Sequence, residues 1–378
     1  MKKTRITALL LALAMILALT ACGGGAAPAE EAAPADEAAA PAEEAAPAEE
    51  AAPAEEAAAP ADDGTVYEMK FSSSQVEGTW LGDLIDEYAV MVDEATNGRV
   101  KITIFHNNAL GAPADLWTML TQGGLEILNL GIAQAGEFPI TDIVQTPFLL
   151  TTPDTAGEIM WTLLEEGKLP EFTDNMHVLT FLPTDMQMFA TTDKKIESID
   201  DFAGMKIRAN SGQLITAIEA LGASAVSITT TEVFLSLSQG VIDGGISSPS
   251  AMTAFTWQDV CHYLYAMPIC TGMNYIGVNL DVWNSLPADL QEALDEVSRE
   301  FYDIYMERNN AAQQESIDTM VAAGVEVVEW DDATVQAIKD ATASMLDDLG
   351  ESLNAQGIDG TGLVAEARQI VADSQYEQ

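Results

Sequence analysis

Two patterns of hydrophobic and polar positions alternate along the chain from residue 65 onward. Short segments that alternate with period two, or that are continuously apolar, predict strands, and longer segments with apolar residues three and four apart predict helices. The strands expected first are 66–73, 100–105 and 125–132, and the helices between them are 79–96 and 112–121. This β-α-β-α-β order predicts a largely parallel sheet with helices on its faces.

A second unit of the same kind follows. After a helix at 153–167 and an apolar strand at 177–182, Ser198 and Asp201 have the spacing of a capping box that precedes a strand at 205–209. Helices at 212–221 and 230–239 then alternate with strands at 225–228 and 242–246. The pattern predicts a second α/β unit.

One helix is expected to be much longer than the others. Residues 287–323 have apolar positions at helical spacing, with Ser285 as a cap and Gly324 as a stop. Such a helix would extend roughly 55 Å, which is longer than one small domain. A strand at 325–330 and helices at 332–349 and 363–372 complete the chain.

These elements predict an α/β fold of two domains. We expect residues 65–186 with about 273–312 in the first domain, and residues 187–272 with about 313–378 in the second. The long helix would then run along both domains. A ligand cleft is expected between them, at the strand ends.

The first 22 residues have the pattern of a secretory signal. Lys2, Lys3 and Arg5 precede an apolar run of about a dozen residues, which is too short to span a bilayer comfortably. The sequence Leu-Thr-Ala-Cys that ends at Cys22 resembles a bacterial lipobox. Diacylation of Cys22 would anchor the mature chain in a membrane, whereas an ordinary signal peptide would be cleaved near Ala21.

Residues 23–64 have a different composition, dominated by a repeat of Ala-Ala-Pro-Ala-Glu-Glu. Twelve carboxylates and six prolines, with no aromatic residue and no cation, cannot bury a core. We expect a disordered, extended tether that carries the folded part away from a membrane. The alternative is a tolerated low-complexity insertion.

Charge excludes one large class of partners. The chain has 15 basic and 60 acidic residues, a net charge of −45, and residues 65–378 alone keep 12 basic and 48 acidic residues. Nucleic acid requires a basic face, which this composition does not supply.

Cys261 and Cys270 could form a disulfide in an oxidising compartment or remain buried thiols, and the sequence leaves both possibilities open.

Motifs of catalysis are missing from the sequence. It has no phosphate-binding loop ending in Gly-Lys-Ser/Thr, no Gly-x-Ser-x-Gly and no His-Glu-x-x-His, and its three histidines are scattered. We therefore expect no enzyme activity, no catalytic residue, no metal site and no cofactor.

The most specific segment is Gly204-Met205-Lys206-Ile207-Arg208, a strand that ends on one of few cations in an acidic chain. Here the sequence resembles the solute-binding proteins of tripartite ATP-independent periplasmic (TRAP) transporters, from residue 67 to about 365. The resemblance rests on the order and spacing of the following segments: Asn97-Gly98-Arg99-Val100, Ala109-Leu110-Gly111, Gly123-Gly124-Leu125-Glu126, Pro147-Phe148-Leu149, 199–208, Gly222-Ala223-Ser224, Glu232-Val233-Phe234 and 239–244.

The resemblance implies a fold and a function. The fold is similar to type II periplasmic binding proteins, and the function is capture of an organic acid outside the cytoplasm for delivery to TRAP permease subunits. In this family the arginine at the position of Arg208 forms a two-pronged salt bridge with the ligand carboxylate. A planar guanidinium suits that role, although a structural ion pair with one of the many acids is the alternative.

Departures from the sialate-binding branch of the family argue against sialic acid as the ligand. A second arginine of that branch corresponds to Met188, and its other pocket positions correspond to Ser247, Thr230, Ser74 and Gly131. A smaller or more apolar organic acid is expected. Possible pocket walls are Met188, Phe189, Trp117 and Trp257, although such residues more often belong to a core.

Three other functions remain open at this point. An ABC-type importer component would share the two-domain architecture, although the long helix favours the TRAP type. An anchored extracellular hydrolase would need a catalytic pair that the sequence does not single out. A surface protein for adhesion or chemical sensing would bind a ligand without feeding transport.

Overall fold

The computed structural model describes residues 64–132, 138–228 and 230–377. The predicted signal segment, its lipid-attachment residue Cys22 and residues 23–63 of the predicted tether lie outside these ranges. Within them, no helix combines the length and the apolar character that crossing a membrane requires.

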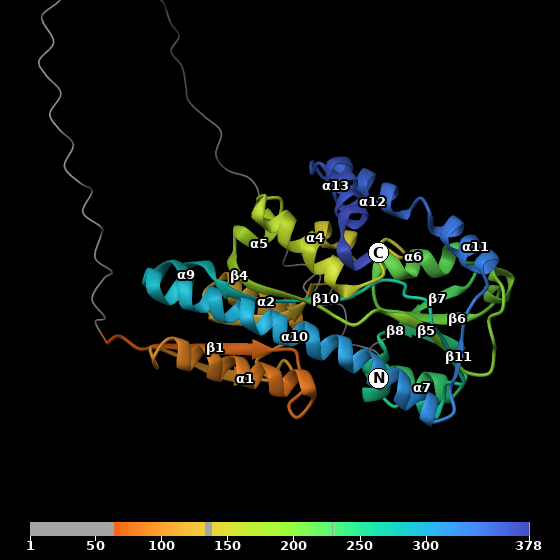
Figure 1. The fold of residues 1–378 in the computed structure, drawn as a ribbon, viewed down its shortest axis with the longest axis horizontal. Coiled ribbons are helices and arrows are strands. Elements are labelled where there is room, and N and C mark those ends of the chain that lie inside the picture. Colours follow the sequence, from red (N-terminus) through yellow and green to blue (C-terminus); the bar gives the residue numbers. More distant parts are fainter. Residues whose placement is uncertain (1–63, 133–137, 229, 378) are drawn as a thin grey trace, which may run out of the picture. The chain divides into compact units, whose positions relative to one another are not determined.

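The first of two β-sheets has five strands in the order β2-β1-β3-β10-β4 (Figure 1). Its strands are β1 (Tyr67–Ser73), β2 (Val100–Phe105), β3 (Ile127–Gly131), β4 (Met176–Pro183) and β10 (Met273–Asn279). Strand β1 runs parallel to β2 and β3, as expected. Strand β10 was not expected, and it lies antiparallel between β3 and β4. The sheet is therefore mixed.

Both faces of this sheet are buried, because neighbouring residues of a strand point to opposite sides. Leu128 and Tyr275 belong to one apolar core cluster, whereas the adjacent Ile127 and Ile276 belong to another. The helices that flank the sheet are α1 (Trp80–Ala95), α2 (Pro113–Thr121), η1 (Pro139–Ile143), α4 (Pro153–Glu165), α5 (Pro170–Thr173) and α9 (Leu280–Ser285).

The second sheet has six strands in the order β11-β9-β5-β8-β6-β7. They are β5 (Met188–Thr191), β6 (Lys206–Ala209), β7 (Ser224–Ser227), β8 (Gly244–Ser247), β9 (Tyr263–Tyr265) and β11 (Glu326–Val328). Strand β6 is parallel to β7 and β8, and β5 is antiparallel to β8 and β9. Its helical elements are η2 (Ile199–Phe202), α6 (Gly212–Ala220), α7 (Thr230–Ser238), α8 (Pro249–Ala254), η3 (Trp257–Asp259) and α11 (Asp332–Thr342).

The long helix α10 (Ala288–Ala322) contributes to the cores of both sheets. Leu294, Phe301 and Tyr305 are buried in the cluster against the first sheet, whereas Met320 is buried in a cluster of the second. Between these regions the side-chain oxygen of Gln313 accepts a hydrogen bond from the backbone N–H of Met186 at 2.8 Å. A single helix thus connects both halves, as the sequence predicted.

Two chain segments cross between the sheets side by side. The segment after β4 pairs with the segment before β10, because the N–H of Gln187 donates to the carbonyl of Cys270 at 2.8 Å and the N–H of Thr184 donates to that of Gly272 at 2.9 Å. The hydroxyl of Thr271 also donates to the Thr184 carbonyl at 2.6 Å. We call residues 184–187 and 269–272 the crossover pair.

The C-terminal helices correct the expected division of the chain. Residues 313–378 were assigned to the second domain, but α12 (Met345–Ala355) and α13 (Gly360–Asp373) pack into the first sheet's core, beside α4. Leu349, Leu353 and Val364 are buried there. The single helix expected at 332–349 is instead α11 and α12, which separate at Ala343 and Ser344. The short helix η4 (Gln375–Glu377) follows.

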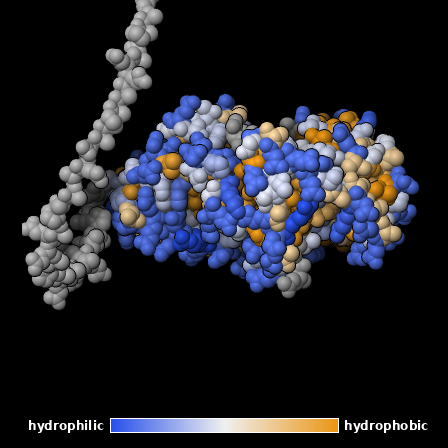
Figure 2. All heavy atoms as spheres, turned by 90° about the horizontal axis from the view of Figure 1, so that it is seen from above, coloured by the Kyte–Doolittle hydropathy of each residue, from blue (hydrophilic) through white to orange (hydrophobic). Residues whose placement is uncertain are grey.

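The surface and the cysteines agree with the composition. Hydrophilic residues predominate on the face shown in Figure 2, where small apolar areas interrupt them.

Cys261 and Cys270 are free thiols, and burial raises the pKa of each to about 12. Thiols of that pKa stay protonated and act as small apolar side chains.

Gly244 tests the close packing of β5 against β8. A Cβ at this position would lie 2.6 Å from the carbonyl oxygen of Ala190 and 2.8 Å from Thr191 Cγ2, so backbone would have to move. We expect Gly244→Ala to lower the free energy of unfolding by about 1–3 kcal/mol in urea denaturation. The control is Gly212→Ala in α6, where a Cβ meets no atom within 4 Å. An equal loss in both variants would contradict this interpretation.

Candidate functional site

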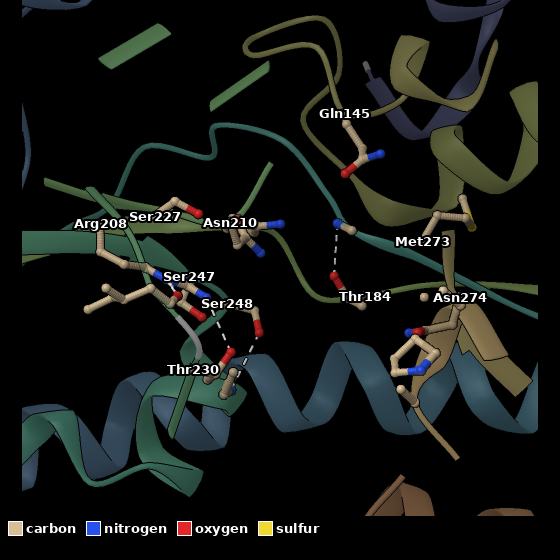
Figure 3. A pocket seen from close by; sticks show the side chains of 18 residues that line it. Gln145, Thr184, Arg208, Asn210, Ser227, Thr230, Ser247, Ser248, Met273 and Asn274 are labelled. Atoms are coloured by element: carbon tan, nitrogen blue, oxygen red, sulfur yellow. Dashed lines mark hydrogen bonds between the residues drawn. The ribbon is translucent and has the colours of Figure 1, made fainter. Parts of the chain in front are cut away.

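A cavity of about 740 Å³ opens at the ends of strands from both sheets. Its walls come from the loop before α2, from β3, β6, β8 and β10, from the starts of α7 and α8, and from the crossover pair (Figure 3). The lining residues are Ala112, Pro113, Ala114, Gly131, Gln145, Thr184, Gln187, Arg208, Asn210, Ser227, Ile228, Thr230, Ser247, Ser248, Ala251, Gly272, Met273 and Asn274.

Arg208 reaches this cavity because of how β6 begins. Gly204 has a φ of 77°, which a side-chain-bearing residue rarely adopts, and it turns the chain after the short helix η2 into the strand. The carboxylate of Asp243 then accepts a hydrogen bond from the N–H of Lys206 at 2.8 Å and fixes the start of β6. Two residues later the strand presents Arg208 at the cavity.

Three hydrogen bonds hold the guanidinium of Arg208. Nε donates to the carbonyl of Ile228 at 3.4 Å, Nη1 to the carbonyl of Ile246 at 3.1 Å and Nη2 to the hydroxyl of Thr230 at 3.2 Å. All three acceptors are uncharged. They orient the planar group without neutralising it, and Figure 3 shows Arg208, Thr230 and Ser247 on one side of the cavity.

Arg208 is a buried cation in a strongly acidic protein. Only 2% of the residue is exposed, and among the residues that the structure describes it forms no ion pair. Burial lowers its pKa to about 10, so it keeps its charge at neutral pH. A buried, unpaired charge is costly to maintain. Proteins retain such a costly group where a charged ligand supplies the missing ion-pair partner.

The other described residues of the cavity wall are uncharged. Its polar side chains are amides and hydroxyls, and its apolar side chains are small or flexible. Gln187 is 6% exposed, and its side-chain oxygen is buried without a hydrogen-bond partner. These groups can donate hydrogen bonds to a polar ligand or accept them from it, but they carry no charge that could pair with a charged group of the ligand.

The structure places the predicted site residues in three environments, which are the cavity wall, an adjoining recess and the apolar cores. Arg208, Thr230 and Ser247 line the cavity together, and so does Gly131. Ser74 instead lines an adjoining recess.

The four proposed wall residues require a correction. Trp117, Met188, Phe189 and Trp257 do not line the cavity, because each is buried in an apolar core cluster. The ring of Trp257 occupies space that Gly245 of β8 leaves free, because a Cβ on Gly245 would be 3.0 Å from that ring and 3.3 Å from Arg208 Cβ. Gly245 is the partner of Arg208 in the pairing of β8 with β6.

Sequence reasoning missed the lining residues of the crossover pair and of β10, which include Thr184, Gln187 and Asn274. A single sequence gives little signal for them. Their segments are short and irregular, and β10 pairs with partners more than ninety residues distant in the sequence, which periodicity does not reveal.

Two further recesses adjoin the cavity. One, of about 670 Å³, shares Asn210 and Ser227 with it and contains Asp142. The other, of about 640 Å³, shares four lining residues with it and contains Asp185 and Glu315. Burial raises the pKa of Asp142 to about 6 and also raises the pKa of Asp185. In the described ranges, no cluster of three or more His, Cys, Asp or Glu side chains could hold a metal ion.

Asp142 offers a test of these electrostatics. Because its pKa in the fold is about 6, above the usual value near 4, the folded state holds the proton more tightly than the unfolded state. The free energy of unfolding therefore falls as the pH rises from about 4 to about 6. We expect Asp142→Asn to raise the free energy of unfolding by about 1–2 kcal/mol at pH 7.5, measured by urea denaturation, and to change it little at pH 4.

The matched control is Asp193→Asn, because the Asp193 side chain is 89% exposed and the substitution changes the net charge by the same amount. It should leave the pH dependence of unfolding nearly unchanged. If both variants gained stability equally at pH 7.5, the effect would come from net charge and not from burial of Asp142.

Comparison with known protein families gives a match over most of the folded part. Residues 71–352 match the bacterial extracellular solute-binding proteins, family 7. A curated relative, the C4-dicarboxylate-binding periplasmic protein of Rhodobacter capsulatus, is 24% identical over 310 residues, which cover 77% of this chain and 88% of the relative.

Solved structures show the same fold. A TRAP solute-binding protein from a marine metagenome, specific for aromatic acid ligands and in complex with metahydroxyphenylacetate, superposes with a TM-score of 0.75. It is 20% identical, and the match covers 82% of this chain and 100% of that one. A TRAP periplasmic solute-binding protein of Chromohalobacter salexigens with bound D-glucuronate gives 0.72 at 22% identity, over 80% and 99% of the two chains.

Proposed function

This chain belongs to the bacterial extracellular solute-binding proteins of family 7, and from that premise we propose that it captures an organic-acid anion through Arg208 and delivers it to a TRAP permease. The members of this family are substrate-binding transport proteins, not enzymes, and they act outside the cytoplasm. The proposal concerns the ligand, the residue that binds it and the permease.

One observation carries the proposal, namely a buried guanidinium without a carboxylate partner in a cavity wall. A guanidinium has five N–H donors, and three hydrogen bonds to the protein leave two for a ligand. Two parallel N–H···O bonds are the geometry that a carboxylate favours. An organic acid would therefore complete the environment of Arg208.

The ligands named for the solved relatives support this chemistry. Metahydroxyphenylacetate and D-glucuronate differ in ring type and polarity, but each contains one carboxylate. A conserved type of anchor with a variable remainder of the cavity would account for such a range. In this chain, we propose that Arg208 is that anchor and that Thr230 and Ser247 act beside it.

The two halves of the protein, each built on one sheet, could close on the ligand. Closure would strengthen the contact between Arg208 and the ligand carboxylate. The cavity has walls from both sheets, and the crossover pair at its base is the natural place for a hinge. Closing would remove water from around Arg208 and its carboxylate, and an ion pair is stronger when water is excluded.

Arg208→Ala tests the anchor. We expect the variant to fold, because removing a buried unpaired cation does not break an ion pair. It should lose about 3–5 kcal/mol of binding free energy for a carboxylate ligand, or roughly two to almost four decades in affinity. Thermal shifts against a panel of mono- and dicarboxylates, aromatic acids and acidic sugars would first identify a ligand. Calorimetry would then give the affinities of both proteins.

Arg308→Ala is the matched control, because Arg308 lies on the surface of α10 and pairs there with Glu87 at 2.9 Å. It should bind the ligand with unchanged affinity. An Arg208→Ala protein that binds as tightly as the unmodified chain would remove Arg208 from the mechanism.

We also propose that Cys22 carries the lipid anchor and that residues 23–64 tether the folded part to the extracytoplasmic face of the membrane. The support is the charge and length of the leader and the Leu-Thr-Ala-Cys sequence. In cells that process lipoproteins, Cys22→Ser should abolish incorporation of labelled fatty acid and move the protein from the membrane to the soluble fraction. Retention of the label in that variant would disprove attachment at Cys22.

A further inference from the structure

We propose that the ligand is a monocarboxylic acid with an uncharged, hydroxyl-bearing body, and that this cavity discriminates against dicarboxylates and α-amino acids. This inference rests on the proposed role of Arg208 as the carboxylate anchor. It goes further, because it derives the charge and polarity of the rest of the ligand from the rest of the cavity.

The first argument is the charge of the cavity wall. Among the described residues that line it, Arg208 is the one charged residue, and the others include no Lys, His, Asp or Glu. A second carboxylate would have to lose its hydration here without gaining a cationic partner. The central cavity can therefore accommodate one negative charge.

The second argument comes from the two adjoining recesses. A ligand that extends past Asn210 and Ser227 enters the recess of Asp142, and one that extends past Thr184 and Asn274 enters the recess of Asp185 and Glu315. Among the described residues, neither recess has a cation in its lining. In both directions from Arg208, a second anionic group would therefore approach acidic side chains without meeting a cation. Nothing there would offset its desolvation cost.

The third argument excludes α-amino acids. The ammonium of such a ligand is fixed next to its carboxylate, so it would lie in the central cavity close to the Arg208 cation. Among the described lining residues there is no carboxylate to receive it. The carboxylate of Asp185 is also engaged elsewhere, because it accepts hydrogen bonds from the N–H of Ser250 at 2.9 Å and from its hydroxyl at 2.7 Å.

The fourth argument identifies the uncharged body as polar. Gln187 in the crossover pair and Asn309 in the recess of Asp185 are 6% and 1% exposed. The side-chain oxygen of Gln187 and the side-chain nitrogen of Asn309 have no hydrogen-bond partner. Buried amides without partners are rare and costly, and a hydroxyl can serve either one, because it both donates and accepts.

Gln187 is the residue that we assign to recognition of a ligand hydroxyl. Its backbone is fixed by hydrogen bonds to Ile269 and Cys270, so its side chain has a defined origin. The side-chain nitrogen lies beside Gly272, because a Cβ at that glycine would be 3.6 Å from Gln187 Nε2. The amide thus stands in the cavity wall at the base of the cleft, where closure would bring it against the ligand.

The experiment uses sets of probes with a shared skeleton, measured by calorimetry on the full mature chain. The six-carbon set is gluconate, hexanoate, glucarate and 2-aminohexanoate. The aromatic set is 3-hydroxyphenylacetate, phenylacetate, 3-carboxyphenylacetate and phenylglycine, which share the phenylacetate skeleton. In at least one set we expect the hydroxylated monocarboxylate to bind at least ~10-fold more tightly than the unsubstituted acid, and at least ~30-fold more tightly than the dicarboxylate or the amino acid.

Two variants test the assignment of residues. Gln187→Leu keeps the size of the side chain and should reduce the preference for the hydroxylated acid while leaving affinity for the unsubstituted acid nearly unchanged. Gln369→Leu, on the exposed face of α13, is its control and should change neither affinity. Asn274→Lys adds a cation to the wall formed by β10, and it should raise affinity for the dicarboxylate at least ~10-fold relative to the monocarboxylate.

The outcomes separate the two proposals. Tighter binding of a dicarboxylate or an amino acid that is lost in Arg208→Ala would overturn the inference of a singly charged, hydroxylated ligand and leave the carboxylate anchor intact. Equal loss of both monocarboxylates in Gln187→Leu would overturn the assignment of Gln187. Binding of every probe with the same affinity in Arg208→Ala would overturn the proposed function itself.

Discussion

The proposed function of this structure depends on keeping one guanidinium charged and without an ion-pair partner inside an acidic protein. With 60 acidic residues in the chain, a carboxylate partner for Arg208 would have been easy to supply, but its three acceptors are two backbone carbonyls and a hydroxyl. Neutral acceptors fix the orientation of the group and leave its charge uncompensated. The backbone of Arg208 lies between two parallel neighbours, β7 and β8, which fix the position of its strand.

The surrounding negative charge has a role in selection as well as in solubility. Among the described residues, acidic side chains line the two recesses beside the cavity and are missing from the wall of the cavity itself. A singly charged ligand gains the attraction of the arginine at short range, where it is strongest. Additional anionic groups would lie where the attraction has fallen and the repulsion has risen.

Much of the architecture could be predicted from the sequence, because strands such as β2 and helices such as α1 and α10 have clear periodicity. The position of Arg208 followed from a turn, a strand and a family resemblance. The strands β5, β9 and β10 could not be predicted, since short segments that pair over long distances carry little local signal. For the same reason Gln187 and Asn274 were missed. Trp117 and Trp257 were mistaken for cavity walls, because large apolar residues occur both in cores and in binding sites and the sequence does not distinguish the two.

The path of the chain has a consequence for how the protein unfolds. Within the described residues, the chain passes between the two sheets through both members of the crossover pair, along α10 and again between α11 and α12. Each half is therefore assembled from segments that are discontinuous in sequence. Because each half is completed by segments that return from the other, we expect the two halves to lose their structure together when the protein unfolds.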